Sequence, residues 1–318
     1  MSFNDAADAT RRLNVILADP SLFTGPYDSG LTAGLAAADV DCRWVVRPLR
    51  AGERADLPTD ISNPIFYRGT DRATWAPKPL RPVLKGFSHI IGWARLLQQI
   101  RRQRPDIVHF QWTVLPIIDA IGMLLARRKA ALVLTVHDAT PYNGDRLSIL
   151  QRVGFDYPIK IAQRVIVHTQ SAAQKLSSRG CDPAKIRVVP HGPLTFSPGL
   201  TQPPLPRADS RFTFVLFGQL KPYKGLDVLV EALALTPPEY RKQMRIIIAG
   251  APMMNMSTLL RRIAELDLRE TIDLRLGRLP DDQMARLFQE ADSFVFPYRQ
   301  IDASGVYYLV RPLKKWMI

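Results

Sequence analysis

The segment FGQLKPYKGLDVLVEAL combines glycines and lysines in a way that suits anion binding. Gly218 follows an apolar run, Phe212–Phe217, that predicts a buried strand, and Gly225 precedes a helical pattern. Free N–H groups and the dipole at a helix amino end favour an anion there. Lys221 and Lys224 add positive charges suited to a diphosphate. This turn is therefore a candidate diphosphate site.

This segment matches neither of the two common nucleotide-binding fingerprints. No G-x-G-x-x-G sequence follows an expected strand, so the dinucleotide fingerprint is missing. The G-x-x-x-x-G-K pattern also fails, because the fifth residue after Gly218 is Tyr223. A surface turn with two solvated lysines is the alternative, and spacing alone does not separate it from an anion site.

Several histidines offer polar chemistry in the first part of the chain. His109 and His137 each follow a strand pattern, at the end where doubly wound sheets bind ligands. Asp138 can orient His137 or accept a hydrogen bond from a ligand hydroxyl, or it can simply cap the next turn. His191, in the sequence PHG, is placed near a cleft between two lobes. His168 is interpreted as structural, and a structural role is also the alternative for His109 and His137.

The elements that must position these residues are short apolar strands alternating with amphipathic helices. This alternation predicts βαβ units and a parallel sheet. The strands expected in the first part are Leu13–Ala18, Arg43–Val46, Asp106–Phe110, Ala131–Val136, Arg164–Val167 and Ile186–Val189.

A proline-rich segment, Ser197–Arg211, interrupts the alternation and predicts a linker between two lobes. We expect an N-terminal domain at 1–197, a linker at 198–211 and a second domain at 212–318. The strands expected in the second domain are Phe212–Phe217, Met244–Ala249, Thr271–Leu274 and Ser293–Phe296, and the helices are Leu226–Leu235, Met256–Leu266 and Asp281–Glu290.

Composition limits the classes of protein. The chain has 318 residues, 47% of them apolar, which is normal for a globular protein of about two domains. It contains no apolar run long enough to span a membrane, and the start MSFNDAADATRRLN lacks the apolar region of a signal peptide. Cys42 and Cys181 are too few for a disulfide framework or a zinc site, and they predict ordinary thiols in a reducing cytosol.

The chain is strongly basic, with 43 Lys and Arg against 29 Asp and Glu and a net charge of +14. Such an excess suits nucleic acid, an anionic membrane surface or anionic substrates. Arg-rich stretches interleaved with aromatics are absent, which argues against nucleic acid. A membrane face fits better, because Arg and Lys clusters beside apolar helices are attracted to anionic lipid headgroups.

Two predicted apolar helices are relevant to whether the chain contacts a membrane. Phe87–Arg104 is the clearest amphipathic pattern, and Pro105 ends it. Trp112–Ala126 is apolar and is followed by three basic residues. We favour a core helix there, and the alternative is a helix at the bilayer interface with a basic rim. The residues expected on one face of the first helix are Ile90, Ile91, Ala94, Leu97 and Ile100.

The segments of this chain resemble, in order, those of family-four (group 1) retaining glycosyltransferases. FGQLKPYKGLDVLVEAL is similar to the family pattern G-R-L-x-x-x-K-G-x-x-x-L-x-x-A. RLPDDQMARLFQEADSFVFPY and IDASGV resemble the approach to the donor-binding loop and its start. PDIVHFQW, VLTVHDATPYNG and IRVVPHGPLTFSP are similar to first-lobe segments. The resemblance covers nearly the whole chain and implies the α/β GT-B architecture, in which two doubly wound Rossmann-like domains face each other across a cleft.

The resemblance implies roles for residues of the opening segment. Lys224 would contact the donor's diphosphate, and Gly218 would belong to the same donor-binding turn. The family's usual arginine is replaced by Gln219, so Lys221 would have to supply the missing charge. Arg278 and Pro280 would lie near the base of the donor, because they belong to the stretch that resembles the approach to the donor loop.

The donor loop and the first lobe receive roles from the same resemblance. Asp302 would take the acidic position where most relatives have Glu. Ser304, Gly305 and Val306 would bring backbone N–H groups to the phosphates. In the family, the loops that here carry His109 and His137 bind the transferred sugar or the acceptor. Many relatives have His-x-His after the fourth strand, whereas this chain has the sequence His109–Phe110–Gln111.

The second domain is short compared with the family. The four expected strands would leave the last of them, Ser293–Phe296, as an unpaired parallel edge, which proteins normally avoid. The sequence after Val306, YYLVRPLKKWMI, gives no signal of the helix and strand that continue the family pattern. We therefore expect an incomplete second domain, from a truncation or frameshift near residue 306.

The sequence thus predicts a glycosyltransferase that moves a sugar from a nucleotide sugar to a glycan or lipid-linked acceptor with retention of configuration. The family chemistry implies no bound metal or other cofactor, and no metal-ligand cluster is visible in the sequence. A cytoplasmic protein, peripheral to an anionic membrane surface, is expected. The alternatives are a non-catalytic remnant and a GT-B nucleotide-sugar epimerase.

Overall fold

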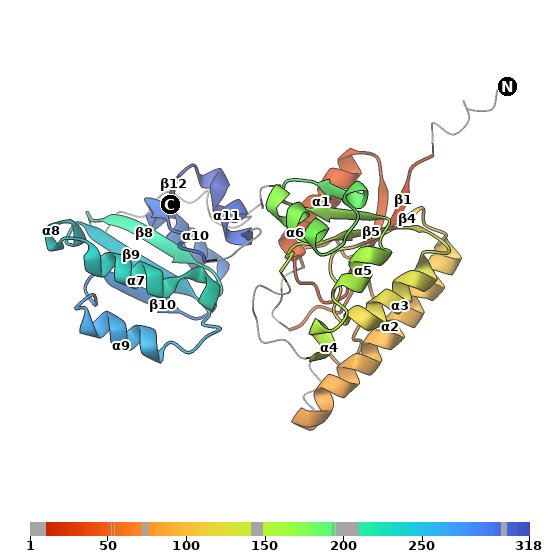
Figure 1. Ribbon diagram of the computed structural model, residues 1–318, viewed down its shortest axis with the longest axis horizontal. Helices are drawn as coiled ribbons and strands as arrows, with labels where there is room; N and C mark the ends of the chain where they lie inside the picture. Colours follow the sequence, from red (N-terminus) through yellow and green to blue (C-terminus); the bar gives the residue numbers. More distant parts are fainter. Residues whose placement is uncertain are drawn as a thin grey trace. The chain divides into compact units, whose positions relative to one another are not determined.

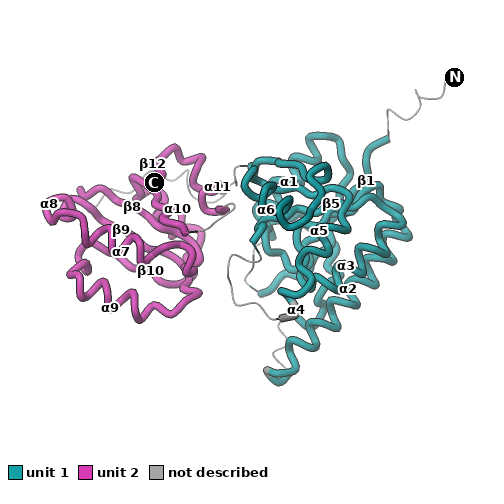
Figure 2. Tube along the Cα trace, in the orientation of Figure 1, with its two compact units in different colours: residues 1–192 teal, residues 193–318 magenta. Residues whose placement is uncertain are grey.

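The chain forms two compact α/β units, residues 1–192 and 193–318 (Figure 2). The structure is a computed structural model that describes residues 11–51, 53, 55–71, 76–140, 149–192, 194, 210–299 and 304–318. Each unit alternates strands and helices along the chain and contains one parallel sheet (Figure 1). The expected fold class, with two Rossmann-like domains, is therefore confirmed.

The first unit has a seven-stranded parallel sheet with strand order β3-β2-β1-β4-β5-β6-β7. Its order reverses between β1 and β4, as in a doubly wound fold. The expected strands are all present, with small shifts at their ends, and β3 was missed because its three residues, SNP, carry no apolar pattern. The strands are β1 Asn14–Asp19, β2 Asp41–Val46, β3 Ser62–Pro64, β4 Ile107–Phe110, β5 Ala131–Thr135, β6 Arg164–Val167 and β7 Ile186–Val188.

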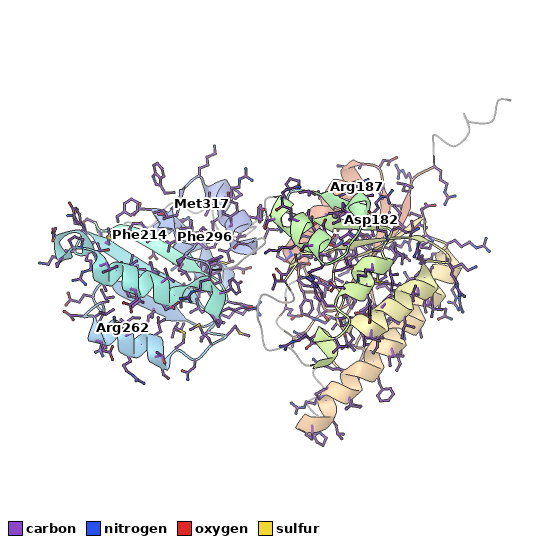
Figure 3. The ribbon with its side chains drawn as sticks, in the orientation of Figure 1. Asp182, Arg187, Phe214, Arg262, Phe296 and Met317 are labelled. Atoms are coloured by element: carbon purple, nitrogen blue, oxygen red, sulfur yellow. The ribbon has the colours of Figure 1, made fainter. Side chains whose placement is uncertain are left out.

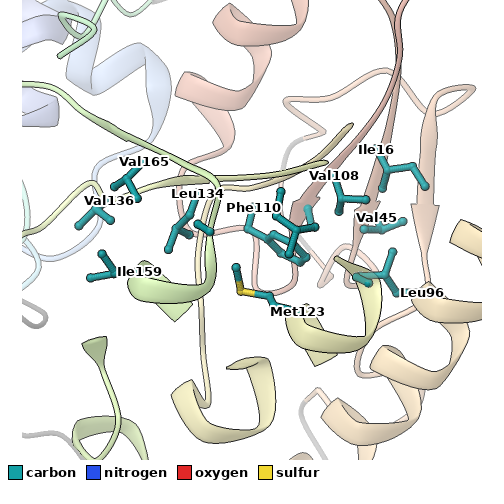
Figure 4. Packing of buried hydrophobic residues seen from close by; sticks show 14 of the residues in the cluster. Ile16, Val45, Leu96, Val108, Phe110, Met123, Leu134, Val136, Ile159 and Val165 are labelled. Carbon is teal, nitrogen blue, oxygen red and sulfur yellow. The ribbon is translucent and has the colours of Figure 1, made fainter. Parts of the chain in front are cut away.

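Helices connect these strands, and the main core lies between the sheet and several of them. Phe110 of the sheet packs with Leu96 and Met123 of two neighbouring helices (Figure 4). The helices are α1 Gly25–Ala37, α2 Arg81–Gln103, α3 Pro116–Ala126, α4 Ile149–Arg152, α5 Asp156–Ile161 and α6 Gln170–Ser178, with short 3-10 turns at Lys78–Leu80 and Pro183–Lys185.

The long helix α2 differs from its expected orientation. It begins at Arg81, not at Phe87, and its buried side carries Trp93, Leu96 and Ile100. Ile90 and Ile91 are exposed, so the expected single apolar face is wrong. The helix has two apolar rows, and the sheet and α3 cover only one of them.

The second unit has a five-stranded parallel sheet with strand order β10-β9-β8-β11-β12. Its strands are β8 Phe212–Phe217, β9 Met244–Gly250, β10 Ile272–Leu276, β11 Ser293–Phe294 and β12 Trp316–Met317. Its helices are α7 Leu226–Leu235, α8 Pro238–Arg241, α9 Ser257–Glu265, α10 Asp281–Glu290 and α11 Gly305–Val310, with 3-10 turns η4 at Pro222–Lys224 and η5 at Arg311–Leu313.

The expected unpaired edge at residues 293–296 is also wrong. β12 pairs in parallel with β11, with Ser293 opposite Trp316 and Phe294 opposite Met317. The N–H of Phe296 also donates to the carbonyl of Ile318 at 2.7 Å, and Figure 3 shows Phe296 and Met317 close to each other. Sequence patterns missed this strand because two residues are too few to show alternation.

Candidate functional site

In the second unit, the carboxyl end of β8 forms a tight turn that only glycines permit at two positions. Gly218 has φ 111° and Gly225 has φ 65°, both in the region that L side chains rarely adopt. A Cβ at Gly225 would lie 1.9 Å from the carbonyl oxygen of Pro297. These glycines bring the turn after β8 against the segment after β11.

Lys224 lies at the centre of this contact. Its side chain is buried, with 3% of the residue exposed. Its Nζ donates to the carbonyl of Phe217 at 2.8 Å and to the hydroxyl of Tyr298 at 2.8 Å. An ammonium has three N–H donors, so one has no hydrogen-bond partner among the described residues. Burial, and then the nearby charge of Lys221, lower the pKa of Lys224 to about 7.

Two residues of the expected donor loop join this group. The hydroxyl of Tyr298 hydrogen-bonds with the side chain of Ser304, which also accepts from the N–H of Tyr307 at 3.2 Å and caps α11. The side chain of Val306 packs on Gly218, where an added Cβ would come within 2.9 Å of it. The structure thus gathers three segments that are up to 88 residues apart in the chain.

The other described residues of the predicted donor site lie in three segments of the second unit. Gly305 is the first residue of α11, and Gln219 is exposed in the turn after β8. Lys221 is half-buried directly before η4. Arg278 and Pro280 are exposed after β10, which is two strands away from β8 in the sheet. Asp302 lies outside the described residues.

Tyr298 belongs to this candidate site, although sequence reasoning did not single it out. It ends the segment FVFPY that resembled the family, but its type alone gave no role. Burial raises the pKa of its hydroxyl, so the group stays neutral and can accept from Lys224.

In the first unit, aromatic and histidine side chains gather at the carboxyl ends of β4, β5 and β6. Tyr27 lies against three histidine rings, with centroids 4.8 Å from His137, 5.3 Å from His168 and 4.9 Å from His191. The ring of Trp112 stacks on His137 at 5.0 Å and 15°. His168 therefore belongs to this cluster, although its sequence context gave no reason to include it.

The hydrogen bonds fix the proton positions in this cluster. Nδ1 of His168 donates to the carbonyl of Val189 at 3.0 Å, since a carbonyl only accepts. Its Nε2 must then accept from Nδ1 of His137, 3.1 Å away. Burial lowers the pKa of His168 and holds that of His137 well below its usual value, so both rings are neutral. Nε2 of His137 is therefore a hydrogen-bond acceptor.

Among the described residues, two buried acceptors directly after β4 and β5 have no hydrogen-bond partner. They are Nε2 of His137 and Oε1 of Gln111. Both residues line one pocket of about 30 Å³, together with Trp112 and Asp138, which is enough for a water molecule or a single hydroxyl group. Buried polar atoms are normally satisfied, so a hydrogen-bond donor such as a water molecule or a hydroxyl group fits this pocket.

His109 has a different place from His137. It is buried, and its Nε2 lies 2.8 Å from Oγ1 of Thr135 and 3.3 Å from the amide nitrogen of Gln111. Burial lowers the pKa of His109 to about 4. His109 does not line the pocket, so its geometry suits the positioning of Gln111. His191 donates from Nδ1 to the carbonyl of Gly192 at 2.7 Å, and burial lowers its pKa.

The two Rossmann-like domains are those of the GT-B architecture, which glycosyltransferases share. Residues 30–193, more than half of the chain, match the family described as Glycosyltransferase Family 4. Residues 201–307 match the family described as Glycosyl transferases group 1. The chain therefore belongs to the group 1, family 4 glycosyltransferases. Comparison with curated protein sequences gives no match.

Solved structures with the same fold are similar over nearly the whole chain. One is HepE of Anabaena in complex with UDP and glucose, with a TM-score of 0.65 and 18% identity, covering 96% of this chain and 80% of that one. Another is the sucrose-phosphate synthase of Thermosynechococcus elongatus, with a TM-score of 0.60 and 16% identity over 93% and 78%. A third is a putative UDP-N-acetylglucosamine 2-epimerase of Listeria monocytogenes, with a TM-score of 0.55 and 14% identity over 96% and 79%.

Proposed function

We propose that the chain transfers a sugar from a nucleotide sugar to a glycan or lipid-linked acceptor with retention of configuration. The observation that carries the proposal is the buried Lys224, held by two hydrogen bonds, with one N–H that has no partner among the described residues. A lysine placed in this way serves an anion that arrives from outside the protein. The diphosphate of a nucleotide sugar is such an anion, and it is also the leaving group of the reaction.

Lys224 would act mainly by electrostatic stabilisation of the leaving diphosphate. Negative charge accumulates on that group as the glycosidic bond breaks, and a fixed positive charge in a buried site lowers the energy of this state. Lys221, directly before η4, would add positive charge. This charge would replace that of the arginine that the family has at the position of Gln219. Backbone N–H groups of residues 304–306 would contact the phosphates from α11.

In the first unit, the proposal assigns the acceptor side to the pocket beside His137. A sugar hydroxyl there donates to Nε2 of His137 or to Oε1 of Gln111, the two pocket acceptors that have no partner among the described residues. Trp112 offers an aromatic ring at the same pocket, and Asp138 offers a carboxylate. We assign His191 to the same acceptor side and His109 to the positioning of Gln111.

The test is a calorimetric titration with UDP-, GDP- and ADP-sugars, followed by mass spectrometry of donor and acceptor products. Lys224→Met keeps the length of the side chain and removes its charge. We expect it to weaken donor binding by about 1.5–3 kcal/mol, the range for hydrogen bonds to charged groups. The matched control is Lys242→Met, at an exposed lysine after α8, which should bind normally. Unchanged donor affinity in Lys224→Met would contradict the assignment.

The proposal involves no metal ion and no further cofactor, as the family resemblance implies. Among the described residues, no three His, Cys, Asp or Glu side chains are grouped to hold a metal. Turnover should therefore persist in the presence of a chelator, and its loss there would remove this part of the proposal.

A nucleotide-sugar epimerase is the second candidate, because an epimerase shares the fold. The two reactions differ in their products. A transferase releases free nucleotide and lengthens an acceptor, whereas an epimerase returns a donor with an altered sugar. The same mass-spectrometric assay therefore separates them, and a chain that binds no donor would be a non-catalytic remnant.

A further inference from the structure

The outer side of α2 carries a row of exposed apolar side chains. Val83, Phe87, Ile90 and Ile91 lie on it, and Phe87 is 64% exposed. This row is opposite the buried row that contains Trp93, since the two rows are about half a turn apart on the helix. An exposed row of large apolar residues is unusual on a soluble protein and marks an interaction site.

The neighbouring helix α3 has the same property. Ile117, Ile121, Leu124 and Leu125 follow the spacing of one helix face, and all four are exposed. Ile121 is 56% exposed. α2 and α3 pack tightly, because a Cβ at Gly122 would lie 2.3 Å from the ring of Trp93 (Figure 1). We call these two exposed rows the α2–α3 face.

Basic residues accompany this face. Residues 81–129 contain nine Lys and Arg but only two acidic residues, and both of those are engaged. Asp106 pairs with Arg11 at 3.0 Å, and Asp119 is buried under α2.

The end of α3 adds three of these charges. Arg127, Arg128 and Lys129 follow the helix directly, are exposed and form no ion pair with another described residue. The last turn of α2 carries Arg101 and Arg102. Because α2 and α3 are crossover helices of one parallel sheet, their carboxyl ends lie at the same edge, so these charges gather there.

We propose that the α2–α3 face docks on the surface of a bilayer rich in anionic lipids. Apolar rows on two helices with basic ends match the two layers of a membrane surface, where apolar side chains enter the acyl boundary and Lys and Arg meet the headgroup phosphates. Among the described helices none is both long and apolar enough to cross a bilayer. In this proposal the two helices lie on the membrane surface and do not cross it.

Charge favours a bilayer over a second copy of this chain. Two copies joined through this face would bring their basic ends near each other, where like charges repel. Anionic lipid supplies the opposite charge instead. The proposal concerns this face alone and does not depend on sugar transfer.

The first test is co-sedimentation of the full chain with vesicles of phosphatidylcholine alone or with about 30 mol% phosphatidylglycerol, which supplies the anionic charge. We expect binding only to the anionic vesicles. Changing Arg127, Arg128 and Lys129 to Gln should weaken it about a hundredfold, from about 1 kcal/mol for each charge. The control removes three exposed charges from the second unit, Lys242, Arg261 and Arg269, and should bind nearly as well.

The apolar rows are tested separately. Ile90→Ser with Ile121→Ser should weaken binding at least tenfold, because both side chains would otherwise leave water. The control pair is Leu235→Ser with Met253→Ser, at exposed apolar residues of the second unit. These positions are all exposed, and circular dichroism checks that each variant is folded.

A second measurement asks which part of the molecule enters the lipid. Cys42 and Cys181 are buried, and burial raises the pKa of both thiols, so they react poorly. A polarity-sensitive dye can therefore be attached selectively at Ile121→Cys. Anionic vesicles should shift its emission to the blue, with no shift at Leu235→Cys.

Three results would overturn the proposal. One is equal binding to neutral vesicles, and another is an equal dye shift at both positions. The third is a concentration-dependent dimer without lipid that Ile90→Ser with Ile121→Ser converts to a monomer, which would assign the face to a second copy.

Discussion

Lys224 shows how a protein can hold a cation ready for a ligand at a cost in desolvation. Burial disfavours the charged form of a lysine, and the neighbouring Lys221 adds to this effect. Tyr298 and the carbonyl of Phe217 offset part of the cost through hydrogen bonds. The residue therefore titrates near neutral pH in the free chain, and an anion beside it would favour its charged form.

This predicts that donor binding is linked to proton uptake. Below pH 7 Lys224 is charged before binding, so affinity for a nucleotide sugar should be independent of pH. Above pH 7 the free chain loses this proton and must regain it on binding, so the affinity should fall by up to about tenfold per pH unit. Calorimetry in buffers of different ionisation enthalpy measures the number of protons that are taken up on binding. Lys224→Met should take up no proton. A donor affinity of the wild type that does not change with pH would contradict the mechanism.

At the scale of elements, α2 shows why one apolar row is buried and the other is not. The buried row contains Gly92, where a Cβ would lie 2.2 Å from the ring of Phe66, and α3 approaches through Gly122. Small residues on this side of α2 and α3 let neighbouring rings approach closely, so this side can pack against the rest of the unit. Asp119 of α3 then accepts from Trp93 at 2.7 Å and lies 2.6 Å from His89, which locks the two helices together.

Asp119 should be a large contributor to stability. It also accepts from the backbone N–H groups of Val114 and Leu115 at 2.6 and 2.8 Å. Asp119→Ala would remove the partner of these backbone groups and of the buried side chains of Trp93 and His89, and we expect a loss of about 3–5 kcal/mol in the free energy of unfolding. Urea denaturation measures it. Asp282→Ala, at an exposed residue in the first turn of α10, is the control and should cost less than about 1 kcal/mol. A loss that small for Asp119→Ala would mean that the contacts do not hold the helices.

At the scale of the whole molecule, the charge of +14 is distributed unevenly. In the second unit many arginines are paired, as in Arg262 with Glu231 at 2.6 Å and Arg245 with Asp273 at 2.7 Å. Near α2 and α3 the basic residues far outnumber the acidic ones. A net positive charge attracts any anion. Because the excess of basic residues is concentrated near α2 and α3, the attraction is strongest at that part of the surface.

The salt dependence of vesicle binding should reflect this distribution. Raising the ionic strength from about 0.01 M to about 0.15 M shortens the Debye length from about 30 Å to about 8 Å, so binding of the wild type to anionic vesicles should weaken strongly. The variant with Arg127, Arg128 and Lys129 changed to Gln should have a smaller slope of affinity against salt. Parallel slopes for the two proteins would show that the charges near α3 take no part.

The sequence by itself determined the alternation of strands and helices, the two-unit α/β class and the family. These follow from local periodicity and from the order of short segments, both of which are written along the chain. Helix α7 and helix α10 were predicted residue for residue, because each has one apolar row and clear ends. Lys224 was selected for the same reason, since its turn and helix are contiguous in sequence.

Only the tertiary structure decided which groups meet. Tyr298 reaches Lys224 from 74 residues further along the chain and is itself hydrogen-bonded to Ser304, and no local pattern indicates these contacts. The hydrogen bond between His168, which follows β6, and His137, which follows β5, determines which ring nitrogen of His137 is an acceptor. The exposed row of α2 was equally hidden, because periodicity reports that a helix has apolar rows but not which of them the rest of the molecule covers.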